Sequence, residues 1–399
     1  MYDPALNRRE SGIDWLLWAA VGGLMLIGGS FIFSAREVAE LTRPWWRHTA
    51  FNQCLYFAVG IGGVISLCLV EYRRLARWSL VAYWFSILLL LSVFVLGVSR
   101  NGAYRWLDLG PIQFQPSEFA KITFLFAMAN FLSRPVDELR SPPLFVKALG
   151  MAILPFLLIL KEPDLGSALT FLPVSLAMMF VANVPRHYLT RFIGGGAALV
   201  ALVLVDVMFA PEGWRFIKLE EYQKRRLMVY FDLDFAPPNA SEAERHKARL
   251  DKANASQNVR QALISVGSGG LTGKGWRQGT QHSLGFLPRL GAHNDFIFSV
   301  IAEEKGFVGS VCVMACYTVI LFSGIRIAGQ ARDRLGKLLA IGVTALFFTH
   351  VVVNIGMNIG LMPVTGIPLP LLSAGGTSVL CSLLAIGILQ NVQLYRRHY

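Results

Sequence analysis

Residues 79–98 of the chain read SLVAYWFSILLLLSVFVLGV, and this stretch contains no charged side chain. About 20 consecutive apolar residues in a helix span the roughly 30 Å hydrocarbon layer of a bilayer. Nine similar runs are separated by short charged or Gly/Pro-rich pieces. They are 13–33, 51–70, 119–132, 145–160, 165–184, 192–209, 307–324, 338–362 and 377–394. The sequence therefore predicts an all-α polytopic membrane protein of about ten transmembrane helices, forming one membrane domain over residues 1–399.

The composition agrees with a membrane protein. Of 399 residues, 54% are hydrophobic and only 16% are charged, which is too apolar for an ordinary soluble globule. The net charge is +12. We interpret this charge as anchoring to anionic membrane lipids, and we expect no nucleic-acid partner. The five cysteines all lie inside apolar runs, so we expect them to pack within the membrane rather than form disulfides or bind metal.

The positions of Lys and Arg predict the topology. If the N-terminus is cytoplasmic, the inner loops and ends contain sixteen Lys and Arg, and the short outer loops contain six. Cytoplasmic loops of membrane proteins carry an excess of these residues. Both termini are therefore expected in the cytoplasm, with the chain crossing the membrane many times.

One outward region, residues 210–294, is far longer than the other loops. Its first part, 214–231, alternates aromatic and basic residues, as in a helix that lies in the headgroup layer. Residues 232–258 are polar and predict a mobile insert or a short surface helix. The run 266–275, VGSGGLTGKG, lacks the Ser or Thr that follows the lysine of a nucleotide-binding P-loop. It is either a backbone cradle for a lipid pyrophosphate or a tight turn.

Charged residues occur at the outer ends of several spans. Glu118 and Lys121 are three residues apart, so they share one face of a helix and form either a structural ion pair or part of a site. Glu162 and Asp164 lie at the tip between two spans, where acidic residues usually form a solvated turn.

The helix that follows the outward region has an acidic residue at its start. Asp295 is either a helix cap or a general base facing a sugar hydroxyl at the outer leaflet. Residues 296–328 contain few helix breakers and, if they form one continuous helix, would span roughly 50 Å. Its Glu303 and Glu304 would stand in the outer headgroup zone or line a cavity there.

Three polar residues, His350, Asn354 and Asn358, recur every four positions within one predicted span. Hydrogen bonds between helices are one explanation for such a stripe. Polar residues inside a membrane also mark transport pathways, so the stripe is compatible with movement of a lipid headgroup.

Several strings occur together and in a fixed order. They are RWLDLG at 105–110, FQPSE at 114–118, EPDLG at 162–166, GSGGLTGKG at 267–275, GTQ at 279–281, DFIF at 295–298, VNIGM at 353–357 and LMPVTGIPLP at 361–370. In these strings the chain closely resembles the SEDS family of shape, elongation, division and sporulation proteins. The forms GKG, GTQ and TGIPLP favour its elongation branch.

The resemblance implies a peptidoglycan glycosyltransferase that polymerises lipid II at the outer leaflet. Asp295 matches the family's essential aspartate, expected to deprotonate the 4-hydroxyl of the acceptor sugar. Glu118, Lys121 and Asp164 match residues of the family's outer cavity and are expected to bind substrate. We expect the same of three residues in the Gly-rich region, which are Lys274, Arg277 and Gln281.

The resemblance also implies partners. Lipid II carries a disaccharide-pentapeptide on undecaprenyl pyrophosphate, and a class B penicillin-binding protein of the elongation complex would cross-link the product. A divalent cation, Mg²⁺ or Mn²⁺, is an alternative to Lys and Arg for balancing the pyrophosphate charge. Two other functions stay open: a lipid II flippase, and a non-catalytic scaffold for a cell-wall complex.

Overall fold

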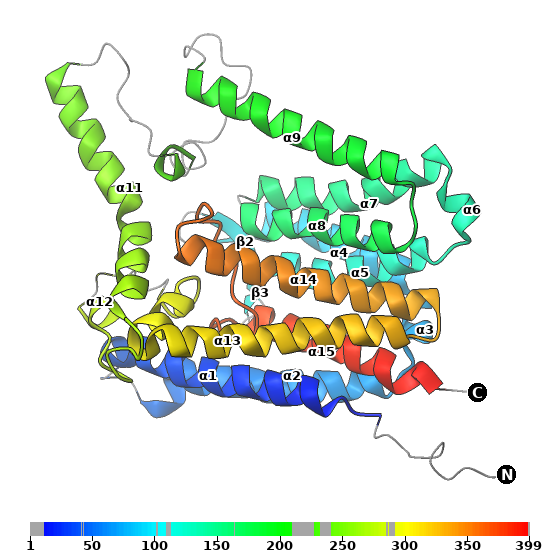
Figure 1. Ribbon diagram of the computed structural model, residues 1–399, viewed down its shortest axis with the longest axis horizontal. Helices are drawn as coiled ribbons and strands as arrows, with labels where there is room; N and C mark the ends of the chain where they lie inside the picture. Colours follow the sequence, from blue (N-terminus) through cyan, green and yellow to red (C-terminus); the bar gives the residue numbers. More distant parts are fainter. Residues whose placement is uncertain are drawn as a thin grey trace.

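The structure is a computed structural model dominated by long helices that run along the long axis of the molecule (Figure 1). It describes residues 12–40, 42, 44–100, 103–108, 113–162, 164–209, 227–231, 241–284, 286 and 292–397. Ten of its helices coincide with the ten predicted spans. They are α1 (Trp15–Glu40), α2 (Thr49–Cys68), α4 (Ser79–Leu96), α5 (Pro116–Leu132), α7 (Pro142–Lys161), α8 (Leu165–Val181), α9 (Arg186–Phe209), α13 (Ile297–Gln330), α14 (Arg334–Asn358) and α15 (Gly376–Leu394).

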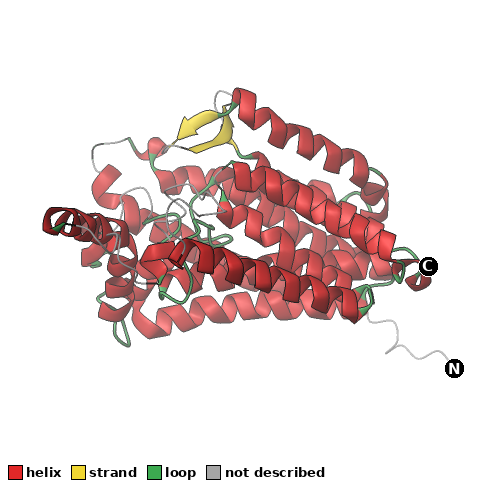
Figure 2. Ribbon diagram, turned by 90° about the horizontal axis from the view of Figure 1, so that it is seen from above, coloured by secondary structure: helices red, strands yellow, loops and turns green. Residues whose placement is uncertain are grey.

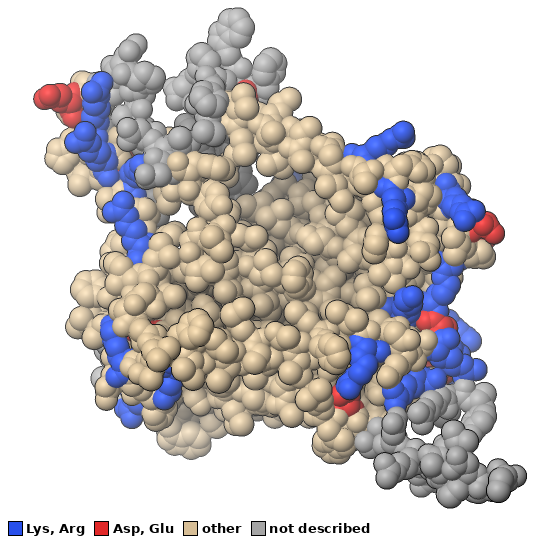
Figure 3. All heavy atoms as spheres, in the orientation of Figure 1, with Lys and Arg blue, Asp and Glu red and all other residues tan. Residues whose placement is uncertain are grey.

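Eight of these helices are long and apolar enough to cross a membrane. The other two, α5 and α8, have 17 residues each, and α5 carries the charged residues Glu118 and Lys121 in its first turns. In a surface view, charged side chains gather at the two ends of the molecule and leave an uncharged band between them (Figure 3). The predicted polytopic all-α fold is therefore confirmed.

The first and last described residues of the chain lie close together, at the same end of the molecule. The Gln390 side chain donates a hydrogen bond to the carbonyl of Gly12 at 2.8 Å, and Arg326 forms an ion pair with Asp14. The short helices α3 (Tyr72–Arg77) and α6 (Val136–Leu139) lie at this end, which we call the terminal end, while α11 (Glu242–Ser268) and α12 (Thr280–Ser283) lie at the opposite end (Figure 1). The even number of crossings agrees with the predicted topology, whose cytoplasmic side stays a prediction.

The bundle is built around α14 and α15. Of their most apolar 18-residue windows, 61% and 72% of residues are buried inside the protein, against 22% for α2. Close packing of α15 on α2 uses glycines, because a Cβ on Gly387 would lie 3.4 Å from Val64 and one on Gly60 would clash with Leu383. The central helices therefore form a rigid frame for the polar groups they carry.

The helix over residues 296–328 is not continuous, so the length of roughly 50 Å does not apply. α13 is interrupted at Gly306, whose φ of 64° and ψ of −156° are not helical. Only glycine adopts this conformation readily, because a Cβ would collide with the neighbouring backbone. The helix therefore divides into a short outer piece before Gly306 and a long piece after it.

The Gly-rich segment fills the break in α13. The N–H groups of Lys274 and Gly275 each donate to a carbonyl of the outer piece, those of Glu303 and Glu304, at 3.0 Å. In return, Phe307 and Val308 donate to carbonyls of the Gly-rich segment at 2.9 and 3.1 Å. The backbone groups that the break leaves unpaired are thus satisfied, as burial requires. The tight-turn interpretation holds, and these amides are not available to cradle a pyrophosphate.

A small antiparallel sheet, absent from our prediction, lies at the end opposite the termini (Figure 2). Its strands in order are β1 (Val98–Arg100), β2 (Ala103–Asp108) and β3 (Gln113–Phe114). The span predicted over residues 79–98 ends earlier, because Gly97 takes an extended conformation that stops α4. The sheet then leads the chain into α5.

The outward region is more helical than predicted. α11 (Glu242–Ser268) has 27 residues, and its final turns pack against α13 while its start projects from the bundle (Figure 1). The prediction of a short surface helix within 232–258 was therefore too short at its C-terminal end. The amphipathic segment 214–231 lies outside the described residues except for 227–231.

Candidate active site

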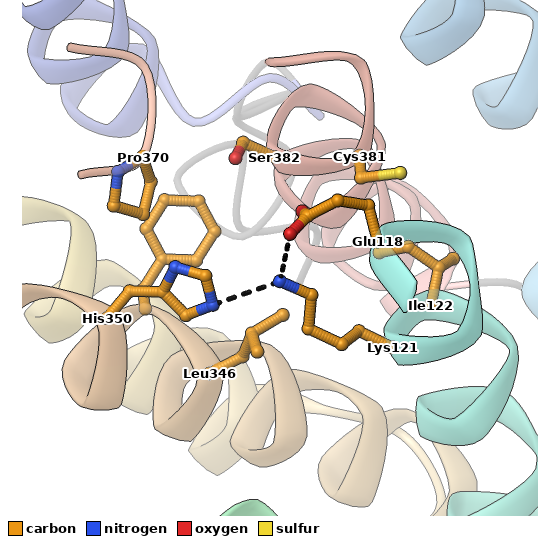
Figure 4. A pocket seen from close by; sticks show the side chains of 9 residues that line it. Glu118, Lys121, Ile122, Leu346, His350, Pro370, Cys381 and Ser382 are labelled. Carbon is orange, nitrogen blue, oxygen red and sulfur yellow. Dashed lines mark hydrogen bonds and ion pairs between the residues drawn. The ribbon is translucent and has the colours of Figure 1, made fainter. Parts of the chain in front are cut away.

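Glu118 and Lys121 form a buried ion pair in the first turns of α5. The ammonium of Lys121 lies 2.7 Å from a carboxylate oxygen of Glu118 and 3.3 Å from Nε2 of His350 on α14 (Figure 4). All three side chains are at most 5% exposed. The other ring nitrogen of His350 lies 3.2 Å from the carbonyl of Pro368. Because a carbonyl can only accept, that nitrogen carries the proton, and Nε2 accepts from Lys121.

Glu118, Lys121 and His350 border a small closed cavity between α5, α14 and α15 (Figure 4). Its free volume is about 10 Å³, which is close to the space that one water molecule occupies. A sugar does not fit there. The substrate-binding roles of Glu118 and Lys121 stay predictions.

A second acidic group lies at the α7–α8 tip, and the solvated-turn interpretation is wrong. Glu162 is 2% exposed and Asp164 is 3% exposed. Asp164 caps α8 by accepting from the N–H of Ser167 at 3.2 Å, and it also accepts from the side chain of Gln115 at 3.1 Å. The guanidinium of Arg105 on β2 lies 3.9 Å from Asp164. The sheet thus places a cation over two buried acids.

Glu162 differs from Asp164 in its environment. Among the described residues, neither of its carboxyl oxygens makes a hydrogen bond. Burial first, and the nearby Asp164 second, raise the pKa of Glu162 to about 8, while Arg105 acts in the opposite direction. Glu162 is therefore protonated at neutral pH, and a single negative charge remains at this tip. Our sequence reasoning did not assign a role to Glu162.

Asp295 is partly exposed and its main chain is held firmly. Its carbonyl accepts hydrogen bonds from the side-chain amides of Asn354 and Asn358, both at 3.0 Å. The expectation that Asp295 caps α13 is wrong, because the N-cap is Phe296 and Asp295 lies one residue before it. Its carboxylate faces the loop after α14, since an oxygen lies 3.6 Å from where a Cβ on Gly366 would be.

The loop 361–375 joins these groups into one site. Two of its consecutive carbonyls are bound by the polar stripe of α14: Asn354 donates to the carbonyl of Ile367 at 2.7 Å, and His350 donates to that of Pro368. On its other side the loop touches α8 beside Asp164, because a Cβ on Gly166 would lie 2.9 Å from the carbonyl of Thr365. The stripe also bonds to other helices, since Ser299 of α13 donates to Asn358 at 2.6 Å and Lys121 of α5 contacts His350. Hydrogen bonding between helices was one of our two interpretations.

The three predicted residues of the Gly-rich region form a separate cluster around α13. Lys274 pairs with the fully buried Glu303 at 2.6 Å, and the same carboxylate accepts from the N–H of Gln281 at 3.1 Å. The N–H of Arg277 donates to Glu304 at 3.1 Å. Two acids in an otherwise apolar helix were the sequence signal for this cluster, because buried carboxylates need partners. The substrate-binding roles of Lys274, Arg277 and Gln281 stay predictions.

A search for relatives gives a clear result for almost the whole chain. A family model that covers the FtsW, RodA and SpoVE proteins and is described as "Cell cycle protein" matches residues 14–398. The chain belongs to this family. The resemblance to the SEDS proteins is thereby confirmed.

Named relatives of this family member include enzymes. The peptidoglycan glycosyltransferase MrdB of Escherichia coli is 36% identical over 344 residues, which are 85% of this chain and 84% of MrdB. The peptidoglycan glycosyltransferase RodA of Treponema pallidum is 30% identical over 96% of this chain and 98% of RodA.

Solved structures share the fold. A chain from a study of a peptidoglycan synthase complex that coordinates polymerization and crosslinking is 27% identical, with a TM-score of 0.77 over 97% of this chain and 99% of that chain. RodA of Thermus thermophilus, also 27% identical, gives a TM-score of 0.67 over 98% and 99% of the two chains.

Proposed function

We propose that this chain is a peptidoglycan glycosyltransferase that polymerises lipid II into glycan strands during cell elongation, on the outer face of the bacterial cytoplasmic membrane. Family membership and the named relatives support the reaction. The main structural support is the loop 361–375, which brings Asp295, Asp164 and the Glu118–Lys121 pair together at one end of the bundle.

In this proposal Asp295 is the general base. Its carboxylate removes the proton from the 4-hydroxyl of the acceptor sugar, whose oxygen attacks the pyrophosphate-linked carbon of the donor. The bond from that carbon to the pyrophosphate oxygen breaks, the configuration inverts, and undecaprenyl pyrophosphate leaves. Asn354 and Asn358 position the base, because they hold its carbonyl from the rigid α14.

The departing pyrophosphate needs positive charge nearby. Lys121, Lys274 and Arg277 are the cations that we predicted for this role, and Arg105 joins them because it lies over the acidic tip. A Mg²⁺ or Mn²⁺ ion is the alternative. Asp164 and Gln115 offer oxygen ligands of the kind these ions prefer, and Glu162 would join them once it loses its proton. Among the described residues, however, no three His, Cys, Asp or Glu side chains gather as a metal-binding group.

We also propose a partner of the class B penicillin-binding protein type. One structural neighbour comes from a complex that couples polymerization to crosslinking. The projecting start of α11 is the surface that we assign to this partner, because it stands clear of the bundle on the side of the site.

The two rival functions have less support. A flippase needs a polar path through the membrane, but the stripe of α14 is occupied by hydrogen bonds to Asp295 and to the loop. A scaffold predicts that Asp295 can be lost without loss of activity in the complex.

The test is polymerisation of lipid II in liposomes with the transpeptidase partner present. Wild type and Asp137→Asn, a matched change at a 92% exposed side chain of the terminal end, are expected to give glycan ladders. Asp295→Asn is expected to give none while staying folded and bound to its partner. Ladders from Asp295→Asn would reject this residue as the base. No ladders from wild type, beside an active control polymerase, would favour a flippase or a scaffold.

A further inference from the structure

A groove of about 770 Å³ opens at the terminal end of the bundle, far from the candidate active site. It lies between the α8–α9 junction and the α13–α14 junction. Its volume is within the range of 300–1,000 Å³ that is typical of small-molecule sites. The activity proposed above gives this groove no role.

The rim of the groove is strongly basic. Arg140, Arg186 and Lys337 line it, His187 lies beside them, and none of its lining residues is acidic. Arg140 has an ion pair with Asp137 at 3.5 Å, but both side chains are more than two-thirds exposed, so this pair is weak. The three cations come from three separate segments of the chain, so their convergence results from the fold.

Helix direction adds to the positive potential. Arg186 and His187 occupy the first turn of α9, which contains no acidic residue. The N-terminus of a helix carries partial positive charge, so basic residues are unfavourable there and an anion is favourable. The groove therefore places two sources of positive potential around one space.

Apart from Asn183, the remainder of the groove is lined by apolar residues and glycine. Phe180, Ile325 and Ile341 line it toward the middle of the bundle. α9 packs mainly on α8, and only 6% of its apolar window is buried (Figure 1). Because α9 stands apart from α13 and α14, a hydrocarbon chain can enter the groove from the bilayer.

We propose that this groove binds one anionic phospholipid. The lipid phosphate lies between Arg186, Lys337 and Arg140, and the acyl chains lie along Phe180 and Ile325. A free phosphate would use the basic rim but not the apolar wall. A zwitterionic lipid would use the wall but would add its own positive charge to the rim.

The first test counts bound lipids on the purified full-length chain by native mass spectrometry, with phosphatidylglycerol and phosphatidylcholine of identical acyl chains. Wild type is expected to retain phosphatidylglycerol preferentially. A basic residue near a membrane surface contributes roughly a five-fold gain in binding of anionic lipid, so Arg186→Gln with Lys337→Gln should weaken it about 25-fold. The matched control is Arg74→Gln with Arg77→Gln, which removes two exposed charges of the same end outside the groove. Equal losses in both double variants would overturn the proposal.

A second test blocks the groove without changing its charge. A Cβ on Gly329 would meet no atom within 4 Å, and Gly329 lines the groove, so Gly329→Phe is designed to place a bulky ring there. Gly150→Phe is the control, because Gly150 is equally unobstructed but faces the outside of α7. Only Gly329→Phe is expected to lose the lipid. Retention of the lipid in Gly329→Phe, equal retention of phosphatidylcholine by wild type, or displacement of the lipid by inorganic phosphate at millimolar concentration would each reject the assignment.

Discussion

Lys121 is held between two acceptors that differ in charge, a carboxylate and a neutral imidazole. Such a buried cation is stable only while its partner carries the opposite charge, because removal of one member leaves an unpaired charge away from water. The same pair can serve catalysis if the charge of Lys121 reaches the substrate. Stability and activity therefore have to be measured on the same variants.

Replacing Lys121 with Met should lower the free energy of unfolding by about 3–5 kcal/mol, since Glu118 then lacks its partner. Adding Glu118→Gln should recover most of that loss, and lipid II polymerisation should stay absent in both variants. Thermal unfolding in detergent and the polymerisation assay measure the two effects. The control is Arg140→Met, which breaks an exposed pair of the same spacing and should cost less than about 1 kcal/mol. Activity in the stable double variant would make the pair purely structural.

We expect the stability of the protein to depend on pH because of Glu162. Its pKa in the folded protein is about 8, above the 4.5 of an unperturbed glutamate. The protonated, folded form is therefore favoured at low pH, and its contribution to stability is lost as pH rises toward 8. Between pH 6 and 9 the wild type should lose about 2 kcal/mol relative to Glu162→Gln, which stays neutral.

The measurement is the Tm of wild type and Glu162→Gln across this pH range. Glu138→Gln, a change at an exposed glutamate of α6, should follow the wild-type curve. Parallel curves for wild type and Glu162→Gln would mean that Glu162 does not titrate between pH 6 and 9, against this prediction. Polymerisation by wild type should also decline above pH 8, because a second negative charge then appears beside Asp164.

At the scale of elements, the break in α13 is held by close backbone contact with the Gly-rich segment. Gly273 has a φ of 83°, and a Cβ on it would lie 2.2 Å from the carbonyl oxygen of Glu304. Gly273→Ala should therefore lower the free energy of unfolding by about 3 kcal/mol. Gly267→Ala is the matched control, because this exposed glycine in α11 has no neighbour within 4 Å and should gain up to about 1 kcal/mol. Similar melting temperatures for the two variants would contradict the close backbone contact between Gly273 and Glu304.

The helices were predictable because each span is an uninterrupted apolar run, and a membrane leaves a backbone few alternatives. The break at Gly306 was not predictable from local sequence, since a single glycine is tolerated inside a helix and its partner segment lies some thirty residues away. The burial of Glu162 and Asp164 depends on β2 and on the loop 361–375, which fold over the tip from distant parts of the chain. The identity of the site residues came from the family resemblance, whereas their contacts came from the fold.

At the scale of the whole molecule, the protein has two chemically different ends. The terminal end carries the basic groove, and the opposite end carries the candidate active site, α11 and the sheet (Figure 1). The excess of Lys and Arg at the terminal end predicts that this end faces the cytoplasm. The proposed reaction requires that orientation, because the growing glycan lies outside the cell.

Orientation can be tested with single cysteines in a chain whose five native cysteines are replaced by serine. Arg249→Cys lies on the exposed part of α11 and Arg77→Cys on exposed α3 at the terminal end. In intact spheroplasts a membrane-impermeant maleimide should label Arg249→Cys and leave Arg77→Cys unlabelled until the membrane is permeabilised, because a charged reagent cannot cross the hydrocarbon layer. The opposite pattern would place the candidate site in the cytoplasm. It would then reject polymerisation at the outer leaflet even if the purified protein formed glycan strands.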